Sequence, residues 1–210
     1  PEYDVAAALR HAHHMYNTRR LVVRGGFGKR IAISDADWQN TFSYYCLIGQ
    51  AERIAYALHQ YCNKTTLIGV WMSSNCDMAQ SMLGVLFAQH IVMPIEQDIQ
   101  PDTFSKLLDQ HCPSIIICSQ AMLESERYAP GRELLRQHNI TLLSSSSLLN
   151  GCSRLTAWLW RKPNPKSSAK TPGVLFPQPD GEAVLLSQHN ICQQAYQLQL
   201  YANLFGNDIC

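Results

Sequence analysis

The run LIGVWM at residues 67–72 decides the fold of this chain. It is almost continuously apolar, which is typical of a strand covered on both faces in a parallel sheet. Three more short apolar runs follow at residues 91–93, 115–118 and 140–143, and stretches with helical spacing of apolar residues separate them. Strands and helices that alternate in this way predict an α/β fold, with a mainly parallel sheet of the doubly wound type flanked by helices.

Local breakers set the expected ends of these elements. Asn75 or Asp77 is expected to open the first helix of the series, because its side chain can accept an N–H of the first turn. Pro94 is expected to end the second strand, and Pro130-Gly131 to interrupt the helical stretch that reaches residue 138. After the serines at 144–147 we expect the regular order to loosen.

Upstream of the 67–72 run the pattern is less regular. Residues 3–15 have helical spacing, and an apolar run at 21–23, a glycine turn at 25–28 and a short strand at 30–33 follow. A longer helix then carries one apolar stripe, formed by Tyr44, Leu47, Ala51, Ile54, Ala55 and Leu58.

A polar segment punctuated by prolines, residues 161–172, separates off the C-terminal part. We therefore divide the chain into an α/β N-terminal part at 1–160, a linker at 161–172, and a segment at 173–210 that continues the same domain. This last segment is expected to contain a short β-hairpin-like pair of strands and a final helix.

The composition is that of a globular protein with a substantial core. Hydrophobic residues make up 46% of the chain and charged residues 16%, which excludes a disordered, collagen-like or coiled-coil protein. The formal net charge of +1 gives no broad field for nucleic acid, and no apolar run approaches the roughly 20 residues of a membrane span. Because the chain begins at Pro1 and stops at Cys210 after a helical stretch, we expect it to be part of a longer protein.

The cysteines and histidines give no site. None of the eight cysteines forms a C-x-x-C pair and no signal peptide precedes them, so we expect reduced core thiols and a cytoplasmic location. His11, His13 and His14 form an H-x-H-H cluster, but no carboxylate or cysteine at ligand spacing completes it, and we assign no metal. The glycine turn at 25–28 lacks the last glycine and the helix of a dinucleotide fingerprint.

Three stretches together resemble the adenylate-forming (AMP-binding) superfamily, which contains acyl-CoA synthetases, acyl–acyl-carrier-protein synthetases and the adenylation domains of peptide synthetases. TFSY at 41–44 is similar to the family's T-[LF]-[TS]-Y opening. Residues 68–76 are similar to its strand and P-N-[SC] turn, with Ser74 in place of the proline. LGVLFA at 83–88 and VMPI at 92–95 are similar to L-G-x-x-K-A-G and V-P-[LI], with Phe87 in place of the lysine and Gln89 in place of the glycine.

The resemblance covers nearly the whole chain and implies a reaction. A fatty or other carboxylic acid attacks the α-phosphate of Mg-ATP, giving an acyl-adenylate and pyrophosphate, and the acyl group then passes to a thiol or another acceptor. In the family, a glycine-rich loop with a lysine, [ST]-S-G-[ST]-[TE]-G-x-P-K-G, holds the phosphates just before an [ST]-H-x-N-I helix start. The later motifs, for adenine, ribose and magnesium, are expected beyond residue 210.

The chain has the strands and the helix start that flank this loop in the family, but the residues between the strands differ from the loop motif. Strands expected at 173–176 and 183–186 flank it, and Ser187 and Asn190 match the helix start that follows, where we expect them to cap a helix over about 189–204. The degenerate phosphate-loop region is Pro177, Gln178, Pro179, Asp180, Gly181, Glu182 and Ala183. It has one glycine, no lysine and two carboxylates, and each carboxylate would repel a triphosphate by about a kcal/mol or more at close range.

We therefore predict that this region does not bind ATP. No cofactor is assigned to the 210-residue chain, and ATP and magnesium are expected only if a longer parent protein is active. The catalytic residues stay unassigned.

Two functions from different classes follow from these observations. The first is the N-terminal portion of an acyl-activating ligase homologue, inactive on its own. The second is a non-catalytic interaction or dimerisation module that keeps the adenylation fold and uses exposed apolar surface. The expected partners are the remaining subdomains of the parent, another protein, a second copy or a carrier protein, with no nucleic acid and no membrane span.

Overall fold

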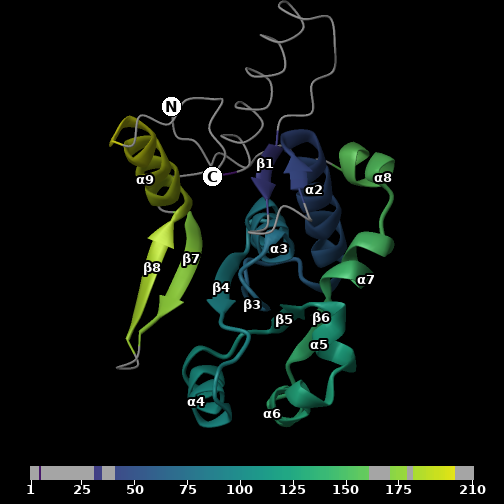
Figure 1. Cartoon of the computed structure of the whole chain (residues 1–210), viewed down its shortest axis with the longest axis vertical. Coiled ribbons are helices and arrows are strands. Elements are labelled where there is room, and N and C mark those ends of the chain that lie inside the picture. Colours follow the sequence, from purple (N-terminus) through teal and green to yellow (C-terminus); the bar gives the residue numbers. More distant parts are fainter. Residues whose placement is uncertain (1–4, 6–30, 35–40, 161–170, 179–181, 202–210) are drawn as a thin grey trace, which may run out of the picture.

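The computed structural model describes residues 5, 31–34, 41–160, 171–178 and 182–201. Their main element is a six-stranded sheet in the order β6-β5-β3-β4-β7-β8. The strands are β3 (Leu67–Trp71), β4 (Ile91–Ile95), β5 (Ile115–Cys118), β6 (Thr141–Ser144), β7 (Pro172–Pro177) and β8 (Ala183–Ser187). All neighbours run parallel except β7 and β8, which form the predicted antiparallel pair (Figure 1).

The strand order confirms the doubly wound topology. The chain leaves β3 for β4 on one side, and then crosses back to β5 on the other side of β3, with β6 beyond it. Because parallel crossovers are right-handed, this reversal places α3 (Cys76–Phe87) on one face of the sheet and α4 (Pro101–His111) on the opposite face. The β5–β6 crossover, which continues in the direction of α4, contains α5 (Gln120–Glu124), η1 (Glu126–Tyr128) and α6 (Ala129–Gln137).

The remaining described elements extend this framework. A two-stranded antiparallel sheet, β1 (Ile31–Ser34) and β2 (Thr41–Ser43), leads directly into α2 (Tyr44–Tyr61), which packs on α3. The chain continues after β6 with α7 (Ser145–Asn150) and α8 (Arg154–Leu159), and it continues after β8 with α9 (Gln188–Tyr201). The expected helix at 3–15 except Val5, the elements at 21–28 and most of the linker, 161–170, lie outside the described residues.

The core lies between the sheet and its helices, as the apolar runs predict. All four residues of β5 are buried, and in β3 every residue after Leu67 is buried. The apolar stripe of α2 is confirmed for the five residues whose side chains are described, all at most 2% exposed: Leu47, Ala51, Ile54, Ala55 and Leu58. The side chain of Tyr44 is not among those described.

Polar caps fix the helix starts. Asn75 is the N-cap of α3, where its side chain accepts a hydrogen bond from the Met78 N–H at 3.0 Å, as predicted. Ser144 caps α7 in the same way by accepting from the Ser147 N–H at 3.1 Å. Such a capping hydroxyl lets a helix begin directly at the end of β6. After residue 147 the regular alternation of strand and helix ends, because the two short helices α7 and α8 follow with no strand between them.

Two expected breaks at proline are wrong, and each has a physical reason. β4 continues through Pro94 to Ile95, with Pro94 opposite Val70 of β3. The pairing of β4 with β7 is confined to Val92 and Val174. Pro94 lies beyond this pair, so its lack of an N–H removes no hydrogen bond between β4 and β7. Pro130 likewise lies in the first turn of α6, where proline is tolerated, and the interruption lies earlier, where α5 ends at Ser125.

Arg53 ties α2 to the end of α7. Its guanidinium Nε donates to the carbonyl of Cys152 at 2.8 Å, and one of its terminal nitrogens donates to the carbonyl of Leu149. Carbonyls in the last turn of a helix have no partner within the helix. Arg53 therefore supplies donors that the short helix α7 cannot provide for itself.

We expect Gly84→Ala to destabilise the protein. A Cβ at Gly84 would lie 2.4 Å from Cγ2 of Ile54, which is fully buried in α2. Overpacking of this kind costs about 1–3 kcal/mol, and the better helix propensity of alanine returns at most about 1 kcal/mol. Urea unfolding of Gly84→Ala, Ile54→Ala and the double variant measures this contact. If the double variant loses as much free energy of unfolding as the two single variants lose together, the side chains at positions 54 and 84 do not clash.

We expect Arg53→Met to loosen α7 and α8 while keeping most of the apolar stem of the side chain. Loss of the donors to Leu149 and Cys152 leaves partly buried carbonyls unpaired, which costs about 1–3 kcal/mol. Hydrogen exchange of the amides of residues 145–159 should accelerate. Arg136→Met is the matched control, because Arg136 is exposed and pairs only with Glu133 among the described residues. Equal effects of the two variants would show that the Arg53 contacts do not stabilise α7.

Candidate functional site

The carboxyl ends of β3, β4, β5 and β7 lie at one edge of the sheet, because these four strands are parallel. In open α/β sheets, ligands bind outside this edge, near the point where the strand order reverses. Two features lie along it in this protein. One is the turn between β7 and β8, which contains the degenerate phosphate-loop region, and the other is a cavity beside Trp71.

The β7–β8 turn is a tight connection between antiparallel strands. Pro177 pairs with Ala183 at the end of the ladder, and the Gln178 N–H donates to the carbonyl of Glu182 at 2.8 Å. The side chains of Gln178 and Glu182 are exposed. Pro179, Asp180 and Gly181, the rest of the predicted region, lie outside the described residues.

This turn has few N–H groups to offer an anion. Pro177 and Pro179 have no N–H at all, and the N–H of Gln178 is already used within the turn. The turn also carries a carboxylate at Glu182. A phosphate cradle needs converging backbone donors and a cation, so the described part of the turn has the opposite chemistry.

The start of α9, directly after β8, agrees with the predicted capping. The Ser187 hydroxyl accepts from the Asn190 N–H at 3.1 Å and donates to Oδ1 of Asn190 at 2.7 Å. Gln188 is 1% exposed, and its backbone N–H donates to the carbonyl of Thr171 at 2.9 Å. Oε1 of Gln188 accepts from the Val5 N–H at 3.3 Å. These bonds fasten the helix start to the base of the hairpin.

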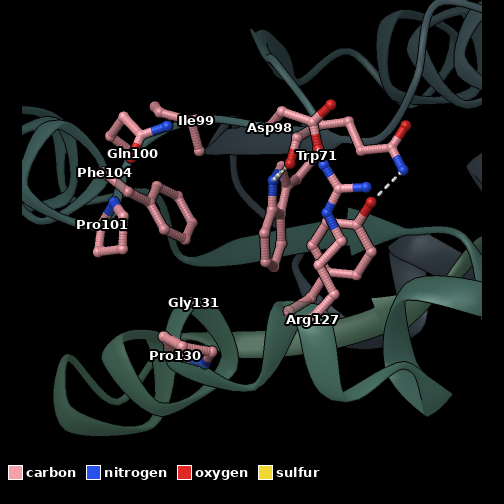
Figure 2. A pocket seen from close by; sticks show the side chains of 11 residues that line it. Trp71, Asp98, Ile99, Gln100, Pro101, Phe104, Arg127, Pro130 and Gly131 are labelled. Carbon is pink, nitrogen blue, oxygen red and sulfur yellow. Dashed lines mark hydrogen bonds and ion pairs between the residues drawn. The ribbon is translucent and has the colours of Figure 1, made fainter.

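The cavity beside Trp71 has a volume of about 190 Å³ and lies where the chain leaves β3 and β4 (Figure 2). Its walls also include the starts of α4 and α6 and the 3-10 helix η1 between β5 and α6. Five of its lining residues have ring side chains: Trp71, Pro101, Phe104, Tyr128 and Pro130. No sequence motif marks this cavity, because its walls come from three separate segments of the chain.

Hydrogen bonds hold the aromatic walls in place. Nε1 of Trp71 donates to the carbonyl of Gln97 at 3.1 Å, and Nε2 of Gln97 donates to the Tyr128 hydroxyl. The ring centroids of Trp71 and Phe104 are 5.0 Å apart, and those of Trp71 and Tyr128 are 5.8 Å apart. Gly131 closes one side, because a Cβ there would lie 2.5 Å from the Trp71 ring.

A metal or thiol site finds no support among the described residues. No group of three or more His, Cys, Asp or Glu in that part of the chain is placed to hold a metal, and His11, His13 and His14 lie outside it. The seven described cysteines are free thiols. Burial raises the pKa of the Cys118 thiol to about 12, against a smaller lowering by Arg132, so this thiol is a poor nucleophile near neutral pH. None of the described helices is both long enough and apolar enough to cross a membrane.

Comparison with known structures supports the fold. The chain is 14% identical to apo MatB from Rhodopseudomonas palustris, with a TM-score of 0.68, over 84% of this chain and 35% of that one. For the N-terminal subdomain of NpsA from Klebsiella oxytoca, the identity is 17% and the TM-score 0.64, over 88% and 42% of the two chains. For the nonribosomal peptide synthetase FmoA3 (S1046A), the values are 13% and 0.70, over 97% and 19%. At these identities, the similarity shows the fold alone.

The chain thus spans between 19% and 42% of the length of these structures. A comparison with curated proteins finds no matching sequence. The family model described as "AMP-binding enzyme" matches residues 23–175. Because this match covers more than half of the sequence, and because the fold agrees with it, the chain belongs to the AMP-binding enzyme family.

Proposed function

We propose that the chain forms the N-terminal α/β portion of an acyl-adenylate-forming ligase that acts on a fatty or other carboxylic acid. The family match over residues 23–175 carries this proposal. The strand–turn–strand–helix order of β7, β8 and α9 supports it, because it is the order in which the family's phosphate loop is framed. MatB, to which the chain is structurally similar, has been determined with ATP bound.

We propose further that this portion is inactive alone and does not bind ATP through the β7–β8 turn. A triphosphate needs several N–H donors and a cation, whereas the described turn uses the N–H of Gln178 internally and presents Glu182. ATP and magnesium would then be cofactors of the longer parent protein only. Residues 1–160 and 173–210 would form one domain across the linker at 161–172, which the pairing of β7 with β4 supports.

Isothermal titration calorimetry with Mg-ATP tests the turn. We expect no saturable binding to the 210-residue chain, while MatB under the same conditions serves as the positive control. Glu182→Lys removes the carboxylate and supplies a cation, but it adds no N–H donors. We therefore expect this variant to remain unable to bind. Saturable micromolar binding by the unaltered chain would show that the turn is a working phosphate site.

ATP–pyrophosphate exchange in the parent protein, with a panel of carboxylic acids, tests the reaction itself. Exchange with any acid of the panel supports the ligase, and the acid identifies the substrate class. Absence of exchange with every acid would favour the second function, a non-catalytic interaction module.

A specific surface favours the interaction module as the second candidate. The hairpin of β7 and β8 forms the side edge of the sheet, and β8 has no further strand beside it among the described residues (Figure 1). Phe176, Val184 and Leu185 on this hairpin are 39%, 46% and 51% exposed. Phe176 and Val184 pair across the strands and share one face, while Leu185 lies on the other face. An edge strand that is apolar on both faces is suited to pairing with another segment.

We propose that this edge receives the rest of the parent protein, a second copy of the chain or a partner such as a carrier protein. The occupant would act in the cytoplasm, which the free thiols of the described cysteines support. In the ligase the edge would be covered by the remaining subdomains, and in the interaction module by the partner.

We expect Leu185→Asp to weaken association at this edge without lowering the free energy of unfolding, because the side chain is half exposed. Analytical ultracentrifugation over a range of concentrations measures self-association, and thermal unfolding measures stability. Leu155→Asp is the matched control, because Leu155 is a 65% exposed leucine on α8. Self-association that is equal in both variants would exclude the hairpin edge as the contact. A chain that stays monomeric at every concentration would exclude a second copy as the occupant.

A further inference from the structure

Helix α8 presents two leucine side chains to solvent. Leu155 and Leu159 are 65% and 69% exposed, which is more than any other large hydrophobic residue in the described part of the chain. They lie four residues apart, so they share one face of the helix. Ala157 lies on the opposite face and is 1% exposed. A helix that only has to fold turns its large apolar residues inward, so the arrangement in α8 is the reverse of the usual one.

The contacts of α8 with α2 fix this orientation. The Ser153 hydroxyl caps the start of the helix by accepting from the Thr156 N–H at 3.1 Å. Just after the helix, the Trp160 ring lies edge-on to Tyr56 of α2, with the ring centroids 5.6 Å apart, and 5.1 Å from the ring of His59. Helix α8 lies on the outer side of α2 (Figure 1), so the two leucines are held facing away from the sheet.

The sequence around α8 is basic. Between residues 134 and 179 there is no Asp or Glu, although the whole chain has a net charge of only +1. Arg154 is the first residue of α8 itself. The basic residues in and after α8 are Arg154, Arg161, Lys162, Lys166 and Lys170. Exposed leucines in a basic segment complement a surface that is apolar inside and negatively charged outside, which is the surface of an anionic lipid bilayer.

The size of this face favours a bilayer over a protein as the occupant. A stable protein interface takes about 20–30 residues from each partner. Helix α8 is six residues long, and its exposed apolar side chains among those described are Leu155 and Leu159. A bilayer requires no matching shape, because its affinity comes from the apolar area that it buries and from the attraction between basic residues and anionic headgroups.

We propose that α8 docks the protein on the surface of an anionic lipid bilayer. Leu155 and Leu159 enter the boundary between the headgroups and the acyl chains, and the positive charge of Arg154 and of the sequence after α8 attracts the anionic lipids. The contact is peripheral. The proposal goes beyond the ligase and does not depend on that reaction, because it rests only on the exposed face and the charge of this segment.

Sedimentation with lipid vesicles tests the proposal on the 210-residue chain. Vesicles of phosphatidylcholine and phosphatidylglycerol in equal parts supply the anionic surface, and vesicles of phosphatidylcholine alone are the comparison. We expect the chain to sediment with the mixed vesicles at low salt and to be released as the salt concentration approaches about 0.5 M, because salt screens exposed charges. Equal binding to both kinds of vesicle would overturn the proposal. Absence of binding to either kind would overturn it as well, and would leave a protein as the occupant of this face.

A double variant tests the two leucines. Leu155→Gln/Leu159→Gln removes the apolar pair, keeps the charge and introduces residues that suit a helix. Affinity for the mixed vesicles should fall about tenfold or more, because the two leucine side chains no longer leave water on binding. Thermal unfolding should stay unchanged, since both leucines are exposed.

The hairpin supplies the matched control for this variant. Val184→Gln/Leu185→Gln replaces two apolar residues that are 46% and 51% exposed on β8, which lies on the other side of the molecule from α8 (Figure 1). We expect this variant to bind the vesicles as the unaltered chain does. If the two double variants bind equally well, α8 is not the docking surface.

A pair of single variants tests the charge. Arg154→Gln should weaken binding to the mixed vesicles about fivefold, which is the effect of one basic residue near an anionic surface. Arg136→Gln removes the same charge from an exposed position on α6 and should have little effect. Equal losses in the two variants would show that only the net charge of the chain matters, and the proposed docking by α8 would be wrong.

Discussion

The rest of the structure depends on the pairing of β3 at the centre of the sheet. This strand has β4 on one side and β5 on the other, so the backbone groups along both of its edges face a neighbouring strand. Its side chains from Ile68 to Trp71 are buried on both faces. A buried strand of this kind requires helices on both faces, and it forces the chain to reverse direction after β4. The candidate sites follow from that reversal, because it places the starts of helices α3, α4 and α6 along one edge of the sheet.

The same constraint explains which parts of the fold the sequence could predict. The apolar runs predicted at 67–72 and 115–118 become β3 and β5, and their limits agree within one residue because nearly every side chain in them is apolar and buried. The breaks predicted at Pro94 and Pro130 are wrong, because proline interrupts an element only where its missing N–H or its ring conflicts with neighbouring residues. Whether proline breaks a strand depends on which side of that strand is paired, and this is known only from the strand order. The role of Ser144 also depends on its context, since its hydroxyl can belong to a turn or cap a helix, and here it caps α7.

The β7–β8 turn shows how hydrogen bonds inside a loop compete with binding by that loop. An antiparallel hairpin uses its N–H groups to close the turn, as Gln178 does with Glu182. A phosphate cradle must leave those groups free and point them at one position, which is why it needs glycines. Two strands followed by a capped helix are therefore compatible with a phosphate cradle and with a closed hairpin turn. The residues between the strands, rather than the fold, decide between a site for a nucleotide and a closed turn.

The cavity beside Trp71 illustrates the opposite situation, in which a cavity forms although no motif indicates it. Trp71 ends a strand, Gln97 follows the next strand, and Tyr128 lies in η1, so these residues are distant in sequence. Each can be explained locally: Trp71 as a core residue, Gln97 as part of a loop and Tyr128 as the N-cap position of α6. Only the strand order β5-β3-β4 brings them together, because it places the loop after β4 and the helices after β5 on either side of the end of β3. A sequence motif consists of residues that lie close together in one segment. A cavity lined by separate segments, which a crossover in the sheet brings together, therefore produces no motif. The cavity beside Trp71 is therefore a property of the fold that only the three-dimensional arrangement reveals.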